Sequence, residues 1–313
     1  MISNAQRLPS GNLVPPLSCT EWLERLDRSQ DGWPDLFRIY GNRPDLVRQK
    51  VRLIRAGLFH FLSVHGNLSV RVYRAPGRIN LRGMHVDTHG GWLNLQTHHR
   101  ETLVAAAKTD DPVHRYANGD PAFTGVEFTL TPYLDRLASV RQRHTPDDPA
   151  ALLELADIQA GSGLPSWGRY ALGTALTAIF HGSPPDGGLR AVVWSDTVQG
   201  ASLSSSASLC VALTLAQWGR AGMTPPLAPL VHGSRQAEWF AGARVGLSDQ
   251  GAVALGQPGS VLFTALWGPE LFPAPPAWHP FPEDATILIL HTFTSRHLSG
   301  SRRADYARNR FAY

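Results

Sequence analysis

The segment LSSSASLCVALTLAQ (Leu203–Gln217) decides how the chain is organised. Three serines, Ser204–Ser206, stand before an apolar stretch with the pattern of a buried helix. Serine is a good helix cap but a poor interior residue, because its hydroxyl hydrogen-bonds the nearby backbone. One serine is enough for a cap. Three of them after Gly200 predict a site where N–H groups and hydroxyls face one partner, and a serine-rich cap without a ligand is the alternative.

The residues before these serines favour a phosphate site. GLRAVVWSD (Gly188–Asp196) predicts a strand, and TVQGASLSSSA leads from it into the helix. A helix N-terminus has unpaired N–H groups and a partial positive charge, which favour an anion. Gly200 lets the backbone approach a ligand, and a serine hydroxyl can bind Mg²⁺ beside a phosphate. No Walker lysine follows, so the loop is not a P-loop.

The composition excludes several classes of protein. The 313 residues suit about two domains, and 43% hydrophobic with 17% charged residues predict a substantial core. A net charge of +4 is too small for a nucleic-acid partner. Cys19 and Cys210 provide no disulfide framework. The N-terminus lacks the pattern of a signal peptide, and no apolar run approaches the roughly 20 residues that cross a bilayer, so we expect a cytoplasmic protein without a membrane partner.

Strands and helices are mixed along the chain. Residues 1–20 read as a loose polar arm, and 21–65 are mostly helical in pattern. Strands are predicted at 68–75, 90–97, 101–108, 123–130, 188–196, 260–266 and 285–293, and helices at 150–160, 167–180 and 226–242. Because strands and helices do not alternate strictly, the pattern predicts an α+β fold.

Two further segments extend the serine motif. RAPGRINLRGMHVDTHGG (Arg74–Gly91) is dense in Gly, Arg, His and Asp, and GARVGLSDQG (Gly242–Gly251) places Asp249 in a glycine-bounded turn. Together with VQGASLSSSA, these segments resemble the three-part pattern of the GHMP kinases, most of all the galactokinase branch. SWGRYALG and HTFTSRHLSGSRRADYARNR are similar to lesser motifs of that branch. The resemblance covers roughly residues 35–310.

This resemblance implies an ATP-dependent sugar-1-kinase that uses Mg²⁺ and phosphorylates the anomeric hydroxyl of galactose or a C6-modified galactose-like sugar. The implied α+β fold has a mixed α/β N-terminal domain over 21–250 and a partial, ferredoxin-like C-terminal domain over 251–313. We expect a monomer or weak homo-oligomer. The family's glycine-rich third motif has no counterpart before Tyr313. A truncated or split kinase and a non-catalytic sugar or ATP sensor therefore stay open.

The resemblance also assigns roles to residues. Arg78 matches the arginine that stabilises charge on the transferred phosphoryl group, and Asp249 matches the catalytic aspartate beside the attacking hydroxyl. Ser206, or its neighbour Ser205, matches the serine that reaches Mg²⁺. The loop expected to hold the ATP phosphates consists of Gly200, Ala201, Ser202, Leu203, Ser204, Ser205, Ser206 and Ala207. Ser202 stands where the family has glycine, and only glycine enters positive φ freely.

Glu238 matches the helix glutamate that completes the Mg²⁺ site. The interval to Asp249 is one residue shorter than in the family, and one residue rotates a helix by about 100°, so Glu238 faces away unless a bulge compensates. The histidines His89, His98 and His99 show no metal-ligand spacing, and we expect structural or surface roles for them.

The expected sugar site contains His85 and Asp87, which match the pair that hydrogen-bonds sugar hydroxyls, and Tyr306. Galactokinases carry glutamate at the position of Met84. Its loss removes a negative charge, which would suit a uronic acid or a deoxy sugar. A uronic acid would also need a cation, for which Arg82 and Arg100 are the candidates near in sequence.

Overall fold

The structure, a computed structural model of the whole chain, describes residues 13–28, 33–83, 86–88, 90–146, 148–266 and 271–290. Within these ranges the helices are α1 (Cys19–Arg28), α2 (Pro34–Tyr40), α3 (Pro44–His65), η2 (Val86–Thr88), α4 (Thr131–Arg143), α5 (Pro149–Ala160), α6 (Ser166–Phe180), α7 (Ser205–Arg220), α8 (Leu227–Phe240) and α9 (Ser248–Leu255). The strands are β1 (Leu17–Ser18), β2 (Ser69–Arg82), β3 (Trp92–Thr109), β4 (Val113–Asn118), β5 (Val126–Thr129), β6 (Gly188–Ser195), β7 (Ser260–Ala265) and β8 (Ala277–Pro280).

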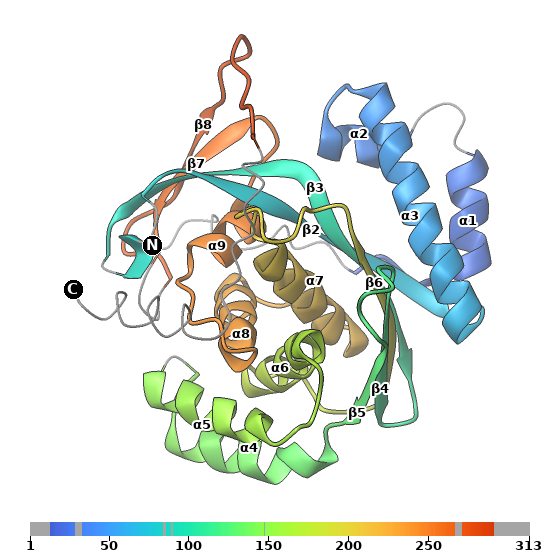
Figure 1. Cartoon of the computed structure of the whole chain (residues 1–313), viewed down its shortest axis with the longest axis vertical. Coiled ribbons are helices and arrows are strands. Elements are labelled where there is room, and N and C mark those ends of the chain that lie inside the picture. The colour runs from blue at the N-terminus through green and yellow to red at the C-terminus, as the bar shows by residue number, and fades with distance from the viewer. Residues whose placement is uncertain are drawn as a thin grey trace.

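One twisted sheet connects the whole described fold (Figure 1). Its strand order is β1-β2-β3-β6-β4-β5, and β7 pairs with both β3 and β8 beside this path. The pair β4–β6 is parallel, and the other pairs are antiparallel. The strand β3 is the centre of the arrangement, because it pairs with β2, β6 and β7 along its length.

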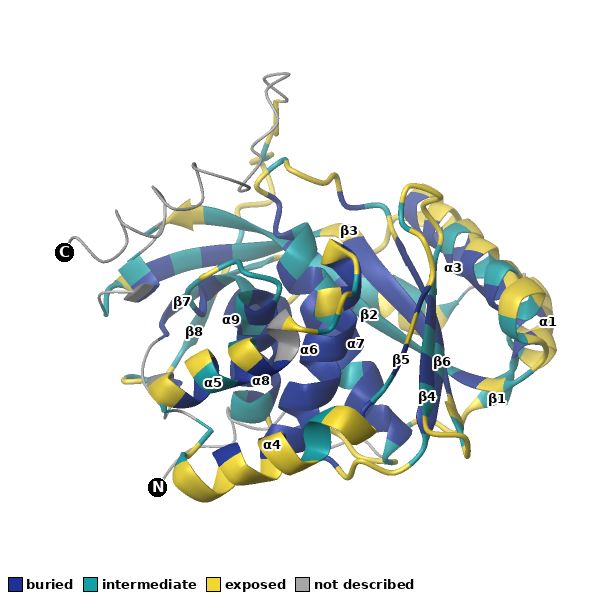
Figure 2. Cartoon of the chain, turned by 60° about the horizontal axis from the view of Figure 1, so that its bottom comes forward, coloured by how far each residue is buried: buried dark blue, intermediate teal, exposed yellow. Residues whose placement is uncertain are grey.

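Helices cover both faces of the sheet, with α1, α2 and α3 on one side and α6, α7 and α8 on the other (Figure 1). Alternate residues of β3 point to opposite layers: Val104 and Ala106 pack with α6 and α7, whereas Ala105 and Ala107 pack with α1–α3. A strand buried on both faces reads as a continuous apolar run, as LVAAA does here. Buried residues accordingly fill the strands and the central helices in Figure 2, while exposed residues lie on the outer faces of α1, α4 and α5.

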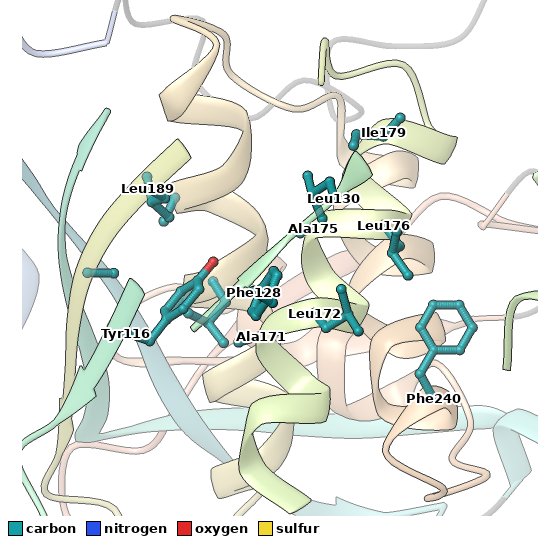
Figure 3. Packing of buried hydrophobic residues seen from close by; sticks show 14 of the residues in the cluster. Tyr116, Phe128, Leu130, Ala171, Leu172, Ala175, Leu176, Ile179, Leu189 and Phe240 are labelled. Atoms are coloured by element: carbon teal, nitrogen blue, oxygen red, sulfur yellow. The ribbon is translucent and has the colours of Figure 1, made fainter. Parts of the chain in front are cut away.

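The largest apolar cluster surrounds α6. Residues Ala171–Phe180 of this helix are all buried, because α7, α8 and the sheet surround it. Figure 3 shows Leu172 and Leu176 of α6 in this cluster, with Phe128 from β5 and Phe240 from α8 around the helix. A second cluster joins α8 and α9 to β3 and β7. Helix α7 contributes Val211, Ala212, Leu213 and Ala216 to the first cluster.

The predicted α+β class is confirmed, and so are the strand at 188–196 and the helix at 167–180. The strands predicted at 90–97 and 101–108 are one continuous strand, β3, with an irregularity in its pairing to β2. The strand predicted at 285–293 is wrong over 285–290, because these residues are irregular. Residues 291–293 lie outside the described ranges. Strand β4 and helix α4 were not predicted.

The domain boundary predicted at residue 250 falls inside α9, and β7 adds to the same sheet as the preceding strands. The division into two domains stays a prediction. In the ranges given above, no helix has the length and hydrophobicity needed to cross a bilayer.

Candidate active site

The segment Gly200–Ala207, called the serine loop from here on, follows β6 and enters the N-terminus of α7, as the sequence pattern predicts (Figure 1). Ser204 is the N-cap of α7, and it has a left-handed φ of 58°. Ser202 also has a φ of 58°, and Gly200 has a φ of 69°. Ser202, which stands where the resembled family has glycine, therefore adopts the backbone conformation that glycine favours. Left-handed serines persist only where neighbouring groups hold them.

Arg78 from β2 and Asp249 from the first turn of α9 meet beside this loop. Arg78 Nε donates to Asp249 Oδ1 at 2.8 Å, and Nη2 donates to the same oxygen. Arg78 Nη1 donates to the Ser202 carbonyl at 3.0 Å. Ser204 Oγ donates to Asp249 Oδ2 at 2.7 Å. Three segments far apart in the sequence thus form one connected group, and both oxygens of the Asp249 carboxylate accept hydrogen bonds.

Glu238 of α8 lies on the same side as the loop. Its carboxyl is buried, accepts a hydrogen bond from Gln250 Nε2 at 2.6 Å and is hydrogen-bonded to Ser206. Burial, with the nearby charge of Asp249 as a smaller cause, raises the pKa of Glu238 to about 8. The sequence left open that Glu238 faces away. It does not, because α8 ends at Phe240 and the shorter interval is absorbed in the turn over 241–247.

A cavity of about 480 Å³ begins at the N-terminus of α7. Ser205 and Ser206 line it, and its other walls include Thr102, Asn118, Trp167, Tyr170, Trp194 and Thr197. The Oγ1 atom of Thr197 and the Nε1 atom of Trp194 are buried without a hydrogen-bond partner in the described part of the chain. Aromatic walls, unused polar atoms and a helix N-terminus at one end suit a nucleotide.

The sequence did not predict the walls of this cavity. The one signal was SWGRYALG, which supplies Trp167 and Tyr170 from α6. In the sequence analysis this segment served only as a lesser motif of the resemblance.

The predicted sugar residues are only partly described. Asp87, in η2, is buried, and its Oδ2 accepts the Ser248 backbone N–H at 3.0 Å. This contact places Asp87 beside the turn that carries Asp249. Met84, His85 and Tyr306 lie outside the described residues.

The two cations suggested for a uronic acid lie in β2 and β3. Arg82 is exposed at the end of β2. Arg100 is also exposed, and its Nη1 donates to the Asp196 carbonyl at 3.0 Å.

Ser206 and Glu238 would hold Mg²⁺ together with a nucleotide, and the cation would favour the ionised form of the Glu238 carboxyl, whose pKa burial raises. Mg²⁺ prefers oxygen ligands, and proteins hold it through one or two carboxylates plus substrate phosphates. Among the described residues there is no cluster of three or more histidine, cysteine and acidic side chains that could hold a metal ion. A site completed by phosphate oxygens needs no such cluster, so the residues present fit the ion.

Comparison with solved structures defines the class of the fold. Lactococcus lactis galactokinase in complex with galactose superposes with a TM-score of 0.60, at 21% identity, over 82% of this chain and 60% of that one. The chain has the GHMP-kinase fold.

Sequence comparisons show similarity to galactokinases. The galactokinase galactose-binding signature matches residues 60–108, which include Arg78 and Asp87. The galactokinase of Streptococcus suis is 27% identical over 245 residues, and that of Pyrococcus furiosus is 28% identical over 240. These alignments cover 77% and 75% of this chain, and 55% and 56% of the relatives. The chain is therefore similar to galactokinases, and it spans about half the length of these relatives.

Proposed function

We propose that this protein is a sugar-1-kinase of galactokinase type, which transfers the γ-phosphoryl group of ATP to the anomeric hydroxyl of a galactose-like sugar. The observation that carries the proposal is the contact of Arg78, Asp249 and Ser204 beside the α7 N-terminus. Phosphoryl transfer requires the phosphate site, the stabilising cation and the group that orients the nucleophile to converge. The galactose-binding signature over 60–108 supports the choice of acceptor.

The nucleotide would occupy the cavity, with its phosphates at the α7 N-terminus. The backbone N–H groups of this helix end and the hydroxyls of Ser205 and Ser206 are the donors for phosphate oxygens. Trp167 and Tyr170 offer aromatic surface for the base. Ser206 and Glu238 would hold Mg²⁺, which neutralises charge on the β- and γ-phosphates when bound.

Asp249 would receive the hydroxyl of the sugar. Its carboxylate can orient the attacking oxygen or accept its proton, and Arg78 holds one carboxylate oxygen in place. The guanidinium also provides positive charge where negative charge develops on the transferred group. Asp87 lies beside the turn before Asp249, which supports a sugar site at this end of α9.

The sugar is galactose or a galactose-like sugar altered at C6, and we expect the altered sugars to compete well with galactose. Met84 cannot hydrogen-bond a 6-hydroxyl as a glutamate does, and it would not repel a carboxylate at C6. His85, Asp87 and Tyr306 would bind the remaining hydroxyls. Arg82 and Arg100 are the cations proposed for a uronic acid.

The test is release of ADP by the purified protein with Mg·ATP and a panel of sugars: galactose, 6-deoxygalactose, galacturonate and glucose. The Asp249→Asn variant is the matched control, because it keeps the shape of the side chain. ADP release that depends on both the sugar and Asp249 supports the proposal. Binding of sugar and nucleotide without turnover would instead identify a sensor built on the kinase fold, and no binding of either would refute both.

A further inference from the structure

Strands β2 and β3 change register beside the serine loop. Pro76 pairs with Glu101 and Arg78 pairs with Thr97. Between these pairs, β2 has only Gly77, whereas β3 has residues 98–100. A bulge of this kind redirects side chains that regular pairing would place differently, and bulges are common next to active sites.

The bulge turns the imidazole of His98 onto Gly77. A Cβ atom at residue 77 would lie 2.5 Å from His98 Nε2 and 2.7 Å from the Leu203 carbonyl oxygen. Any residue larger than glycine would therefore displace the ring or the loop. The absence of a side chain at Gly77 lets His98 and the Leu203 carbonyl lie close together under the serine loop.

The tautomer of His98 follows from its other nitrogen. His98 Nδ1 accepts the Arg100 backbone N–H at 3.1 Å, so Nδ1 carries no proton. Burial lowers the pKa of His98 to about 4, which keeps the ring neutral near pH 7. The single ring proton then resides on Nε2. This atom is buried and has no well-aligned partner in the described chain, and the Leu203 carbonyl is the acceptor beside it.

Leu203 is the residue that needs such support. It lies between Ser202 and Ser204, the two serines with left-handed φ, and its carbonyl also accepts the Arg78 backbone N–H at 3.3 Å. Strained backbone of this kind persists only when several contacts fix it. A second donor on the Leu203 carbonyl would fix the peptide group between the two strained residues.

We propose that His98 is a positioning residue for the serine loop. Its Nε2–H is directed at the Leu203 carbonyl, so that the loop keeps its nucleotide-binding shape. The role in nucleotide binding rests on the function proposed above, whereas the role in ordering the loop does not. The proposal assigns this role to His98 and not to its neighbour His99, which is exposed at the same bulge.

The experiment compares His98→Ala, His98→Gln and His98→Asn with His99→Ala as the matched control. Glutamine presents an N–H near the position of Nε2, whereas asparagine presents one near Nδ1. Two quantities are measured: amide hydrogen exchange of residues 199–206 without ligand, and the Kd of Mg·ADP by calorimetry. Thermal unfolding checks that each variant is folded.

We expect His98→Ala and His98→Asn to speed loop exchange and to weaken Mg·ADP binding by about fivefold, the effect of losing one net hydrogen bond. His98→Gln should restore both quantities, and His99→Ala should change neither. The Kd for sugar should change less than the Kd for Mg·ADP, because His98 contacts the serine loop, where the phosphates are proposed to bind.

Exchange in His98→Ala equal to that of the wild type would overturn the proposal, and so would failure of His98→Gln to restore it. If the wild type binds no nucleotide, the proposed kinase function is refuted instead, and the exchange rates of the loop still decide the role of His98.

Discussion

The left-handed conformation of Ser202 leads to a quantitative prediction about stability. Ser202 and Ser204 have the same φ of 58°, a conformation that costs a residue with a side chain about 1–2 kcal/mol. Their side chains differ in surroundings: Ser202 is exposed, whereas Ser204 is buried and donates to Asp249 Oδ2 at 2.7 Å. Substituting glycine at each position therefore separates the strain of the backbone from the hydrogen bond of the side chain.

For Ser202→Gly the strain is relieved, and the greater freedom of glycine in the unfolded chain offsets about 0.5–1 kcal/mol of the gain. We expect the free energy of unfolding to rise by about 0.5–1 kcal/mol and Tm to rise by about 1–4 °C. Ser204→Gly gains the same relief but loses a hydrogen bond to a carboxylate, worth about 1.5–3 kcal/mol. Its free energy of unfolding should fall by about 1–2 kcal/mol.

Urea unfolding followed by circular dichroism measures both changes, with thermal unfolding as a second readout. Gly200→Ala is the control of opposite sign. Gly200 has a φ of 69° and open space around the position of a Cβ. Gly200→Ala should therefore lower the free energy of unfolding by about 1 kcal/mol, through backbone conformation alone. The reasoning fails if Ser202→Gly destabilises the protein, or if Ser202→Gly and Ser204→Gly shift the free energy in the same direction.

The remaining predictions concern catalysis, nucleotide binding, sugar choice and pH. Asp249→Asn should lower turnover by about 10²–10⁴-fold, as for loss of a proton acceptor, with sugar affinity in calorimetry kept within an order of magnitude. The double variant Ser205→Ala and Ser206→Ala should weaken Mg·ATP binding, and unchanged affinity would mean that these serines only cap α7. Competition assays should show 6-deoxygalactose or galacturonate binding about as well as galactose, with Met84→Glu shifting the preference to galactose; a wild-type preference for galactose of about a hundredfold would contradict this account. Burial lowers the pKa of His114 to about 3, so the unfolded chain binds its proton first, and stability should fall as the pH drops from about 6.5 toward 3. His114→Phe, which keeps the stacking with neighbouring aromatic rings, should flatten that acid limb in urea titrations, and an unchanged slope would exclude His114 as its cause.

The three motifs that meet at Asp249 could be recognised from the sequence, because their chemistry is unusual for loops. Three adjacent serines, an arginine within a glycine-rich strand and an aspartate in a glycine-bounded turn each stand out from ordinary loop composition. Their meeting at Asp249 needed the register of β2 and the entry into α9, which no pattern along the chain supplies. The direction in which the Glu238 side chain points could not be predicted either, because the turn over 241–247 decides it.

The misjudged strands have physical reasons of the same kind. The polar run His98–Arg100 reads as a break between two strands, whereas β3 passes through it by means of a bulge. Strand β4 is short and carries the charged Arg115 between its two buried positions, His114 and Tyr116, which hides its alternating pattern. Conversely, residues 285–290 have the apolar, β-branched pattern of a strand, yet the structure leaves them irregular, because pattern alone provides no pairing partner.

The hydrogen bonds around Asp249 connect the two halves of the proposed reaction. Its Oδ1 is held by Arg78, which also binds the Ser202 carbonyl, and its Oδ2 is held by Ser204 at the helix cap. Both serines that carry backbone strain therefore carry bonds to the Arg78–Asp249 pair. A shift of the loop on binding phosphate would change the orientation of the carboxylate that we propose to face the sugar. Each carboxylate oxygen has two lone-pair directions, and Oδ2 accepts one hydrogen bond, from Ser204, whereas Oδ1 accepts two from Arg78. We therefore expect an incoming hydroxyl to donate to Oδ2, on the lone pair that Ser204 leaves free.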